Sequence, residues 1–208
     1  DRGLSPLAFW SQRVLKMRDI RSLFVKTALT VMAAAMLCMS GCSKADKCDD
    51  ISEDHKPKFT DICFCTGEEE MLKAEGEYSE SYPSLYGGTV YVFPGREFNG
   101  VTGSVKYMTD DAGNIASISW LYESDDTIDV QTRCENIQKG LEKKFGDSGN
   151  KSDSGNNFGD LWYFDDVHIM VNAVITSEYK GMQLTYLKAE YSLKDNVDRK
   201  RKEREQAK

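Results

Sequence analysis

Hydrophobic and polar residues alternate over several short stretches between residues 89 and 192. A period of two places alternate side chains on opposite faces of a strand, one of them toward a core. Turn-forming residues separate the stretches, among them Pro94, Gly95 and the run 110–114, which favours a hairpin. The pattern predicts strands at 89–93, 101–109, 115–123, 161–164, 167–176 and 183–192.

The same alternation predicts which side chains of each strand face a common side. In the second strand these are Val101, Val105 and Tyr107, and in the third Ala116, Ile118, Trp120 and Tyr122. In the fifth strand they are Val167, Ile169, Val171, Ala173 and Ile175, and in the last Leu187, Ala189 and Tyr191.

One long helix is predicted at residues 129–145, between the third and fourth strands. Apolar residues recur there at helical spacing and form one stripe: Val130, Cys134, Ile137, Leu141 and Phe145. Asp126 or Thr127 can cap its start, and Gly146 suits the position after its end. Residues 68–75 predict one or two further helical turns, with Thr66 as the candidate N-cap.

This order of elements predicts an α+β fold of the form β-β-β-α-β-β-β. Short connections favour an antiparallel sheet of five to six strands, with one main helix packed on one face. We expect a single folded domain at 61–194. The parts outside it are an upstream extension at 1–16, a leader at 17–41, a flexible tether at 42–60 and a charged tail at 195–208.

The leader has the layout of an export signal. Three cations, Arg18, Arg21 and Lys26, precede an uncharged run at 27–39, and two small residues then lead to Cys42. The run is shorter than the ~20 residues of a membrane span. The alternatives are a buried helix, a plain membrane anchor and an ordinary cleaved signal with Cys42 merely nearby. Residues before Met17 indicate a start site assigned too far upstream or a long charged region.

The ending Met39-Ser40-Gly41-Cys42 resembles the lipobox of bacterial lipoproteins. The resemblance implies that Cys42 is acylated with fatty acids such as palmitate and becomes the new N-terminus. It also implies a lipid anchor in a bacterial membrane, with the outer membrane, on its periplasmic or surface side, favoured over the inner one. The order of strands and helix resembles that of small envelope lipoproteins of unassigned function. Together, the two resemblances assign a functional role to Cys42 and to no other residue.

The charge balance narrows the class of partner. The chain has 27 basic and 34 acidic residues, and the segment 1–41 holds six of the basic and two of the acidic ones. The remaining 167 residues therefore carry a net charge of −11. A nucleic-acid surface needs the opposite sign, so nucleic acid is not expected as a partner. A cationic protein surface is compatible with this charge, and so is simple solubility.

Four cysteines follow Cys42 in the chain: Cys48, Cys63, Cys65 and Cys134. An even number in an exported chain predicts two disulfides. Cys63 and Cys65 are too close to pair with each other, so one is expected to pair with Cys48 and the other with Cys134. Cys134 also fits a small buried hydrophobic residue on the helix stripe.

Catalytic and metal-binding patterns are weak. The only histidines are His55 and His168, and no nucleophile elbow, phosphate loop or zinc-protease motif accompanies them. His55 with Cys48, Cys63 and Cys65 has the residue types of a zinc site, but its spacing differs from those of zinc fingers and ribbons. We expect no enzyme activity, no metal and no small-molecule cofactor.

The expected function is a membrane-anchored, non-enzymatic envelope lipoprotein that binds another protein through a sheet face or loops. Several aromatic side chains can contribute to such a surface: Tyr78, Tyr82, Tyr86, Trp120, Tyr122, Trp162, Tyr163 and Tyr179. The alternative is an inhibitor or immunity-type lipoprotein that neutralises a cationic enzyme. A hydrolase or redox enzyme built around His168 or the cysteines is a third possibility.

Overall fold

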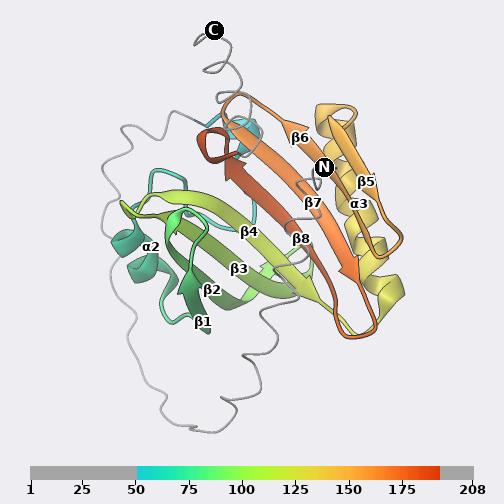
Figure 1. The fold of residues 1–208 in the computed structure, drawn as a ribbon, viewed down its shortest axis with the longest axis horizontal. Helices are drawn as coiled ribbons and strands as arrows, with labels where there is room; N and C mark the ends of the chain where they lie inside the picture. Colours follow the sequence, from blue (N-terminus) through green and yellow to red (C-terminus); the bar gives the residue numbers. More distant parts are fainter. Residues whose placement is uncertain (1–50, 193–208) are drawn as a thin grey trace, which may run out of the picture. The chain divides into compact units, whose positions relative to one another are not determined.

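Eight strands form one antiparallel sheet in the computed structural model, which describes residues 51–192 of the chain. Their order across the sheet is β1-β2-β3-β4-β8-β7-β6-β5, so two four-stranded meanders meet where β4 pairs with β8 (Figure 1). The strands are β1 Glu80–Pro83, β2 Gly87–Phe98, β3 Val101–Asp110, β4 Ile115–Glu123, β5 Asn150–Asp153, β6 Asn157–Tyr163, β7 Val167–Ile175 and β8 Lys180–Lys188.

The α+β class and the antiparallel sheet are confirmed, but the predicted strand number is too low. The two missed strands, β1 and β5, are the outermost ones and each pairs with a single neighbour. Their sequences, ESYP and NKSD, are polar and lack the apolar alternation of a buried strand. Edge strands need little apolar pattern, because backbone pairing on one side holds them.

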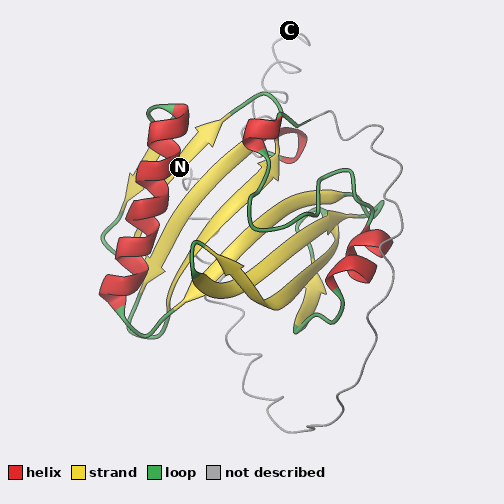
Figure 2. Ribbon diagram, turned by 180° about the vertical axis from the view of Figure 1, so that it is seen from behind, coloured by secondary structure: helices red, strands yellow, loops and turns green. Residues whose placement is uncertain are grey.

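One face of the sheet forms the core, and we call it the helix-covered face. Cross-strand register places Val105, Trp120, Leu184, Val171 and Asp160 in one row across β3, β4, β8, β7 and β6. The apolar members of this row are buried, and the alternating residues of these strands extend the same face. Helix α3, Thr127–Phe145, packs on β6, β7 and β8 on this side (Figure 2).

Helix α3 agrees with the predicted apolar stripe. Val130, Cys134 and Leu141 are buried, and Asp126 caps the start by accepting hydrogen bonds from the Ile128 and Asp129 N–H groups. Gly146 has a φ of 80°, as expected of the residue after a helix end. The helix begins two residues earlier than predicted and follows four strands rather than three.

A second helix, α2 at Glu68–Glu75, packs over β2 and β3 on the same face. Tyr91 and Tyr107, which are cross-strand partners, donate their hydroxyl hydrogens to Glu68 and Glu75 respectively. Glu75 also accepts a hydrogen bond from Nε of Arg96 at 3.0 Å. The predicted cap is wrong, because Gly67 occupies the N-cap position and makes no side-chain cap bond.

The segment at 51–60, predicted as tether, belongs to the folded domain. Ile51 and Phe59 are buried in the core, with the Phe59 ring 5.9 Å from that of Tyr186 on β8. The 3₁₀ turn η2, Glu53–His55, lies between them. The folded domain therefore begins at or before Ile51, which shortens any tether after Cys42. Residues 42–50 and the predicted tail lie outside the described part.

The predicted common face of the last strand, Leu187, Ala189 and Tyr191, is wrong, because only Leu187 lies in β8. Met182, Leu184 and Tyr186 of β8 face the core, and Leu187 lies on the opposite face. The strand ends at Lys188, and the 3₁₀ turn η3, Ala189–Tyr191, follows it. Both faces of β8 are largely buried, so the apolar pattern alone does not distinguish them.

Candidate functional site

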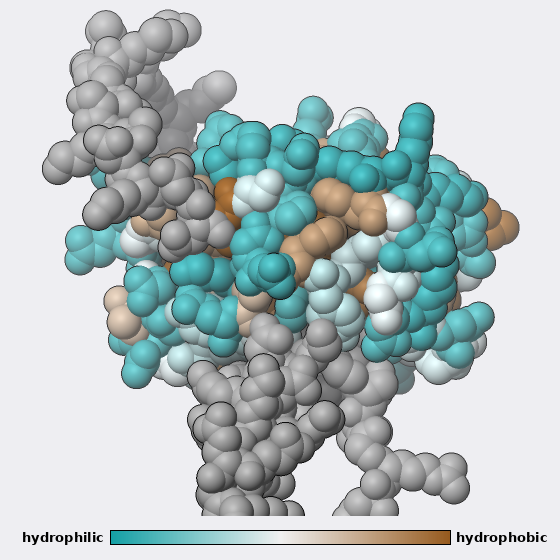
Figure 3. All heavy atoms as spheres, turned by 90° about the horizontal axis from the view of Figure 1, so that it is seen from above, coloured by the Kyte–Doolittle hydropathy of each residue, from teal (hydrophilic) through white to brown (hydrophobic). Residues whose placement is uncertain are grey.

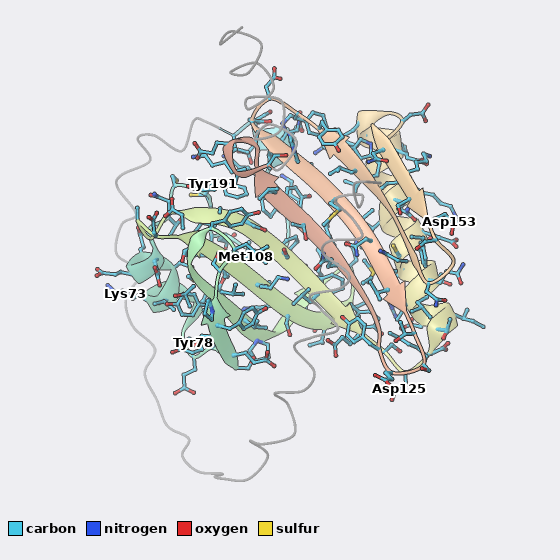
Figure 4. The ribbon with its side chains drawn as sticks, in the orientation of Figure 1. Lys73, Tyr78, Met108, Asp125, Asp153 and Tyr191 are labelled. Carbon is cyan, nitrogen blue, oxygen red and sulfur yellow. The ribbon has the colours of Figure 1, made fainter. Side chains whose placement is uncertain are left out.

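The face of the sheet opposite the helices has an unusual composition. Register aligns Val92, Lys106, Ser119, Thr185 and Met170 in one row across β2, β3, β4, β8 and β7. We call this surface the Lys106 face. All five residues are buried, and neither described helix packs on this side. Met108, two residues along β3 from Lys106 and labelled in Figure 4, belongs to the same face.

Lys106 is the most notable residue of this face. Only 4% of its surface is exposed, and no described residue forms a hydrogen bond or ion pair with its ammonium group. Burial lowers the pKa of Lys106 from 10.5 to about 8, because removing the charged form from water is unfavourable. Buried lysines are rare unless they are paired, so the burial of Lys106 is exceptional among lysines.

Polar oxygens lie on the strand beside Lys106 and on strands further across the same face. Ser119, its direct cross-strand neighbour, shares a hydrogen bond of 3.0 Å with Oγ1 of Thr185. Two buried oxygens on the same face, Oγ of Ser117 and Oδ1 of Asn172, have no hydrogen-bond partner among the described residues. Buried polar groups usually have a hydrogen-bond partner, so these two oxygens are exceptions among the described residues.

Carboxylates of the described strands lie at the margins of the Lys106 face. They are Glu80 on β1, Glu97 near the end of β2 and Glu123 at the end of β4, which are exposed, and the half-buried Asp110 at the end of β3, which accepts a hydrogen bond from the Tyr191 hydroxyl at 2.6 Å. Glu80 is aligned with Lys106 but lies two strands away, about 10 Å at the usual strand spacing. None of the four forms an ion pair with Lys106.

The two histidines lie on different sides of the sheet. His55 packs on the helix-covered side, where its ring stacks on Phe164 at 4.0 Å and Nδ1 lies 2.8 Å from Oδ1 of Asp166. His168 is buried on the Lys106 face, with its ring 4.8 Å from that of Tyr163. The sheet separates them, so the structure does not bring them into one site.

The cysteines do not form the predicted pattern of bridges. Cys63 and Cys134 are free thiols, whereas Cys65 is disulfide-bonded. Neither of the other two described cysteines is therefore its partner, and Cys42 and Cys48 lie outside the described residues. Cys134 is buried between α3 and the sheet, and burial raises the pKa of its thiol to about 12. The alternative of a small buried residue therefore describes Cys134 better.

Exposed apolar side chains are few in the described chain. Three large ones are exposed: Tyr78 by 47%, Leu85 by 39% and Ile128 by 73%. Tyr78 and Leu85 lie just before and just after β1 at one edge of the sheet, and Figure 4 labels Tyr78 there. Seen from above, hydrophobic groups are interspersed among hydrophilic ones over the described surface (Figure 3). We call Tyr78 and Leu85 the β1 patch.

Most of the aromatic residues considered from the sequence serve the core instead. Trp120 and Trp162 are fully buried, and the indole N–H of Trp162 donates to the Gly146 carbonyl at 3.0 Å. Tyr82, Tyr86, Tyr122, Tyr163 and Tyr179 are partly buried. No sequence pattern indicated the Lys106 face, because an isolated lysine in a strand is normally a solvated residue.

Within residues 51–192, no helix is long and apolar enough to cross a membrane, and no cluster of three or more His, Cys, Asp or Glu side chains is arranged to hold a metal ion. The zinc hypothesis also involved Cys48, which lies outside that range. No protein-family model, curated protein or solved structure matches the chain.

Proposed function

We propose that this protein is a lipid-anchored, non-enzymatic component of a bacterial envelope that binds another protein. The anchor is supported by the lipobox-like ending at Cys42, which lies outside the described residues. The binding role is supported by one observation above all. Two of the three exposed large hydrophobic side chains of the described chain, Tyr78 and Leu85, flank the same edge strand.

The β1 patch suits a protein partner. Tyr78 and Leu85 are seven residues apart, which is at most about 23 Å of extended chain, so an extended segment of about seven residues along β1 reaches both side chains. The ring of Tyr78 lies 5.2 Å from that of Tyr91 and 6.3 Å from that of Phe93, in edge-to-face contacts. Such contacts hold the exposed ring in place before binding, which lowers the entropy lost on association.

Charge around the patch favours a basic partner. Glu77 and Glu80 are exposed on either side of Tyr78, and the chain after residue 41 carries a net charge of −11. Opposite charges around an apolar contact accelerate association and exclude acidic competitors. The same negative charge supports a second candidate function, that of an inhibitor or immunity-type lipoprotein whose partner is a cationic enzyme.

The experiment is photo-crosslinking in the intact envelope. A photoreactive amino acid replaces Tyr78 or Leu85, and Ile128 serves as the matched control because it is exposed and apolar but lies on α3. We expect one defined basic protein to crosslink at positions 78 and 85 and not at 128. Equal crosslinking at all three positions, or none at any, would contradict the proposed surface.

The partner recovered in this way also separates the two candidate functions. A cationic enzyme whose activity falls when the purified protein is added supports the inhibitor. A basic envelope component without such an effect supports an assembly or binding role. In either case Tyr78→Ser should weaken binding at least tenfold, and Ile128→Ser should leave it unchanged, because buried aromatic anchors dominate interface energies.

A further inference from the structure

The two outer strands of the sheet differ in how their edges are protected. β1 pairs only with β2, and β5 pairs only with β6 (Figure 1). An edge strand presents a row of unpaired backbone groups, and proteins commonly guard such an edge with charged side chains, especially lysine. β5 carries the exposed Lys151 and Asp153. β1 carries no lysine, and the sequence from 77 to 85 includes no basic residue.

The pairing of β1 with β2 determines which of its backbone groups point away from the sheet. In an antiparallel pair, residues whose groups bond the partner strand alternate with residues whose groups point outward. The Ser84 N–H donates to the Gly88 carbonyl at 2.8 Å, so the groups of Ser84 face β2. Counted back along the continuous register, those of Pro83 and Ser81 point outward. Since proline has no N–H, the outward groups are the Ser81 N–H and the two carbonyls.

The side chains around this edge define the chemistry of a matching strand. Ser81 is small and exposed, so its outward backbone groups are accessible. The exposed apolar side chains of the β1 patch lie beyond the two ends of the strand, within reach of an extended segment of about seven residues. Glu77 and Glu80 are exposed between and beside them, and no cation of this stretch offsets their charge.

We propose that the protein partner docks by adding an extended, basic segment as a further strand beside β1. The backbone of this segment accepts a hydrogen bond from the Ser81 N–H and donates to the carbonyls of Ser81 and Pro83. Its lysine or arginine side chains lie beside Glu77 and Glu80, and its apolar side chains contact the β1 patch. Main-chain bonds give affinity in this mode of recognition, and side chains give specificity. The inference rests on the proposed function, because it assigns the chemistry of the partner at the same surface.

A second copy of this chain is a poorer occupant of the edge. Two β1 strands that pair with each other bring the Glu77 and Glu80 carboxylates of one copy close to those of the other. Like charges across a strand pair are destabilising, and residues 77–85 contain no basic side chain that would relieve the repulsion. A basic segment of another protein meets attraction at the same positions.

The test combines the photoreactive side chain at position 78 or 85 with a change at Ser81. Ser81→Pro removes the outward N–H and leaves the bonds to β2 in place, because the inward groups make them. We expect crosslinking of the basic protein to fall at least tenfold, since a proline ring on this edge takes away the donor that a neighbouring strand needs. Ser81→Ala keeps the N–H and should crosslink like the unmodified chain.

Lys151→Pro on β5 is the matched control. The Ser154 N–H donates to the Asn157 carbonyl at 2.9 Å, so the same alternation points the N–H of Lys151 outward from the opposite edge. This variant should crosslink normally at positions 78 and 85. A fall as large as that of Ser81→Pro would show a general effect of proline in an edge strand, and it would contradict the proposal.

Amide hydrogen exchange gives a second readout that does not depend on the folding of Ser81→Pro. In the crosslinked complex of the chain with unmodified Ser81, the Ser81 amide should exchange at least tenfold more slowly than in the free chain, because a strand partner protects it. The Lys151 amide should exchange at the same rate in both.

Three outcomes would overturn strand addition: crosslinks that survive Ser81→Pro, an unchanged exchange rate of the Ser81 amide, or a crosslinked product made of two copies of this chain. In the first two cases the crosslink to the basic protein still forms, so the proposed function stands while the docking mode fails. Absence of any crosslink at positions 78 and 85 in the chain with unmodified Ser81 removes both. The two failures are therefore distinguishable.

Discussion

His55 and Asp166 are 111 residues apart in the chain, yet Nδ1 of His55 lies 2.8 Å from Oδ1 of Asp166. Asp166 also accepts hydrogen bonds from the backbone N–H of Ser52 at 2.7 Å and of Val167 at 2.9 Å. One carboxylate in the turn between β6 and β7 therefore fixes the start of the described domain. The contact explains why residues 51–60 are folded although their composition is that of a tether.

Loss of the Asp166 charge should destabilise the domain at neutral pH. Burial raises the pKa of Asp166, but the Ser52 and His55 contacts outweigh it, and the pKa is lowered overall. A lowered carboxyl pKa contributes stability above the ordinary value, and that stability is lost as pH falls through the folded-state pKa. Asp166→Asn should therefore cost about 1–3 kcal/mol at pH 7 and flatten the acid side of the stability profile.

The exposed neighbour Asp165 provides the control for this experiment. Asp165→Asn should change the free energy of unfolding by no more than about 0.5 kcal/mol at any pH. Denaturant unfolding of both variants between pH 3 and pH 7 gives the comparison. Equal acid sensitivity of Asp166→Asn and the unmodified chain would show that Asp166 does not hold the N-terminal segment in solution.

Truncation of Leu141 tests the packing of α3 on the sheet. Leu141 is buried in the core, whereas Lys143 on the same helix is exposed. Leu141→Ala should lower the free energy of unfolding by ~2–5 kcal/mol, because truncation leaves a cavity. Lys143→Ala should stay within about 0.5 kcal/mol of the unmodified chain. Similar small shifts in denaturant midpoint, at an unchanged slope, would mean that the helix does not pack as described.

Lys106 should make the free energy of unfolding of the domain change with pH in the alkaline range. With a folded-state pKa of about 8, the folded protein releases its proton before the unfolded chain does at 10.5. Between these values the unfolded state binds more protons, so stability rises with pH. Lys106→Met should remove this rise and should stabilise the domain at pH 7, by an amount on the order of 3 kcal/mol.

Comparison of the unmodified chain with Lys106→Met at pH 7 and pH 10 isolates this effect, because the tyrosines titrate alike in both. The difference in unfolding free energy between the two proteins should shrink as the pH rises. A difference that is the same at both pH values would show that the lysine is solvated.

Alkylation can count the free cysteine thiols of the protein directly. Alkylation of the folded, exported protein without reductant should modify Cys63, which is half-buried, and not the buried Cys134. In denaturant without reductant both should react, while Cys65 should not. Intact mass distinguishes one added group from two. A denatured protein with no reactive thiol would restore the two disulfides predicted from the sequence, and reaction of Cys65 would contradict its bridge.

The sequence predicted well those parts in which one face is apolar and the other polar. The hairpin of β3 and β4 and the helix α3 have this property, and their residues were placed nearly as observed. The pattern failed for β8, where Met182, Leu184 and Leu187 make both faces partly apolar. It also failed for β1 and β5, whose backbone pairing carries no side-chain signature.

Neither the Lys106 face nor the β1 patch could be located from the sequence alone. Lys106 alternates with Val105 and Tyr107, as a solvated lysine on an outward face would, and only the register with Val92 and Ser119 reveals its surroundings. Tyr78 is one of ten tyrosines, and its exposure depends on where β1 ends. Both properties arise from contacts between distant segments rather than from local pattern.

Anchoring through Cys42 underlies the proposed location and therefore the class of partner. Metabolic labelling with palmitate measures it in cells that express the unmodified chain and, in parallel, Cys42→Ala. The proposal predicts label on the unmodified chain, none on the variant, and loss of the variant from the membrane fraction. Equal labelling of the two proteins, or absence of label from both, would contradict a lipid-anchored envelope protein.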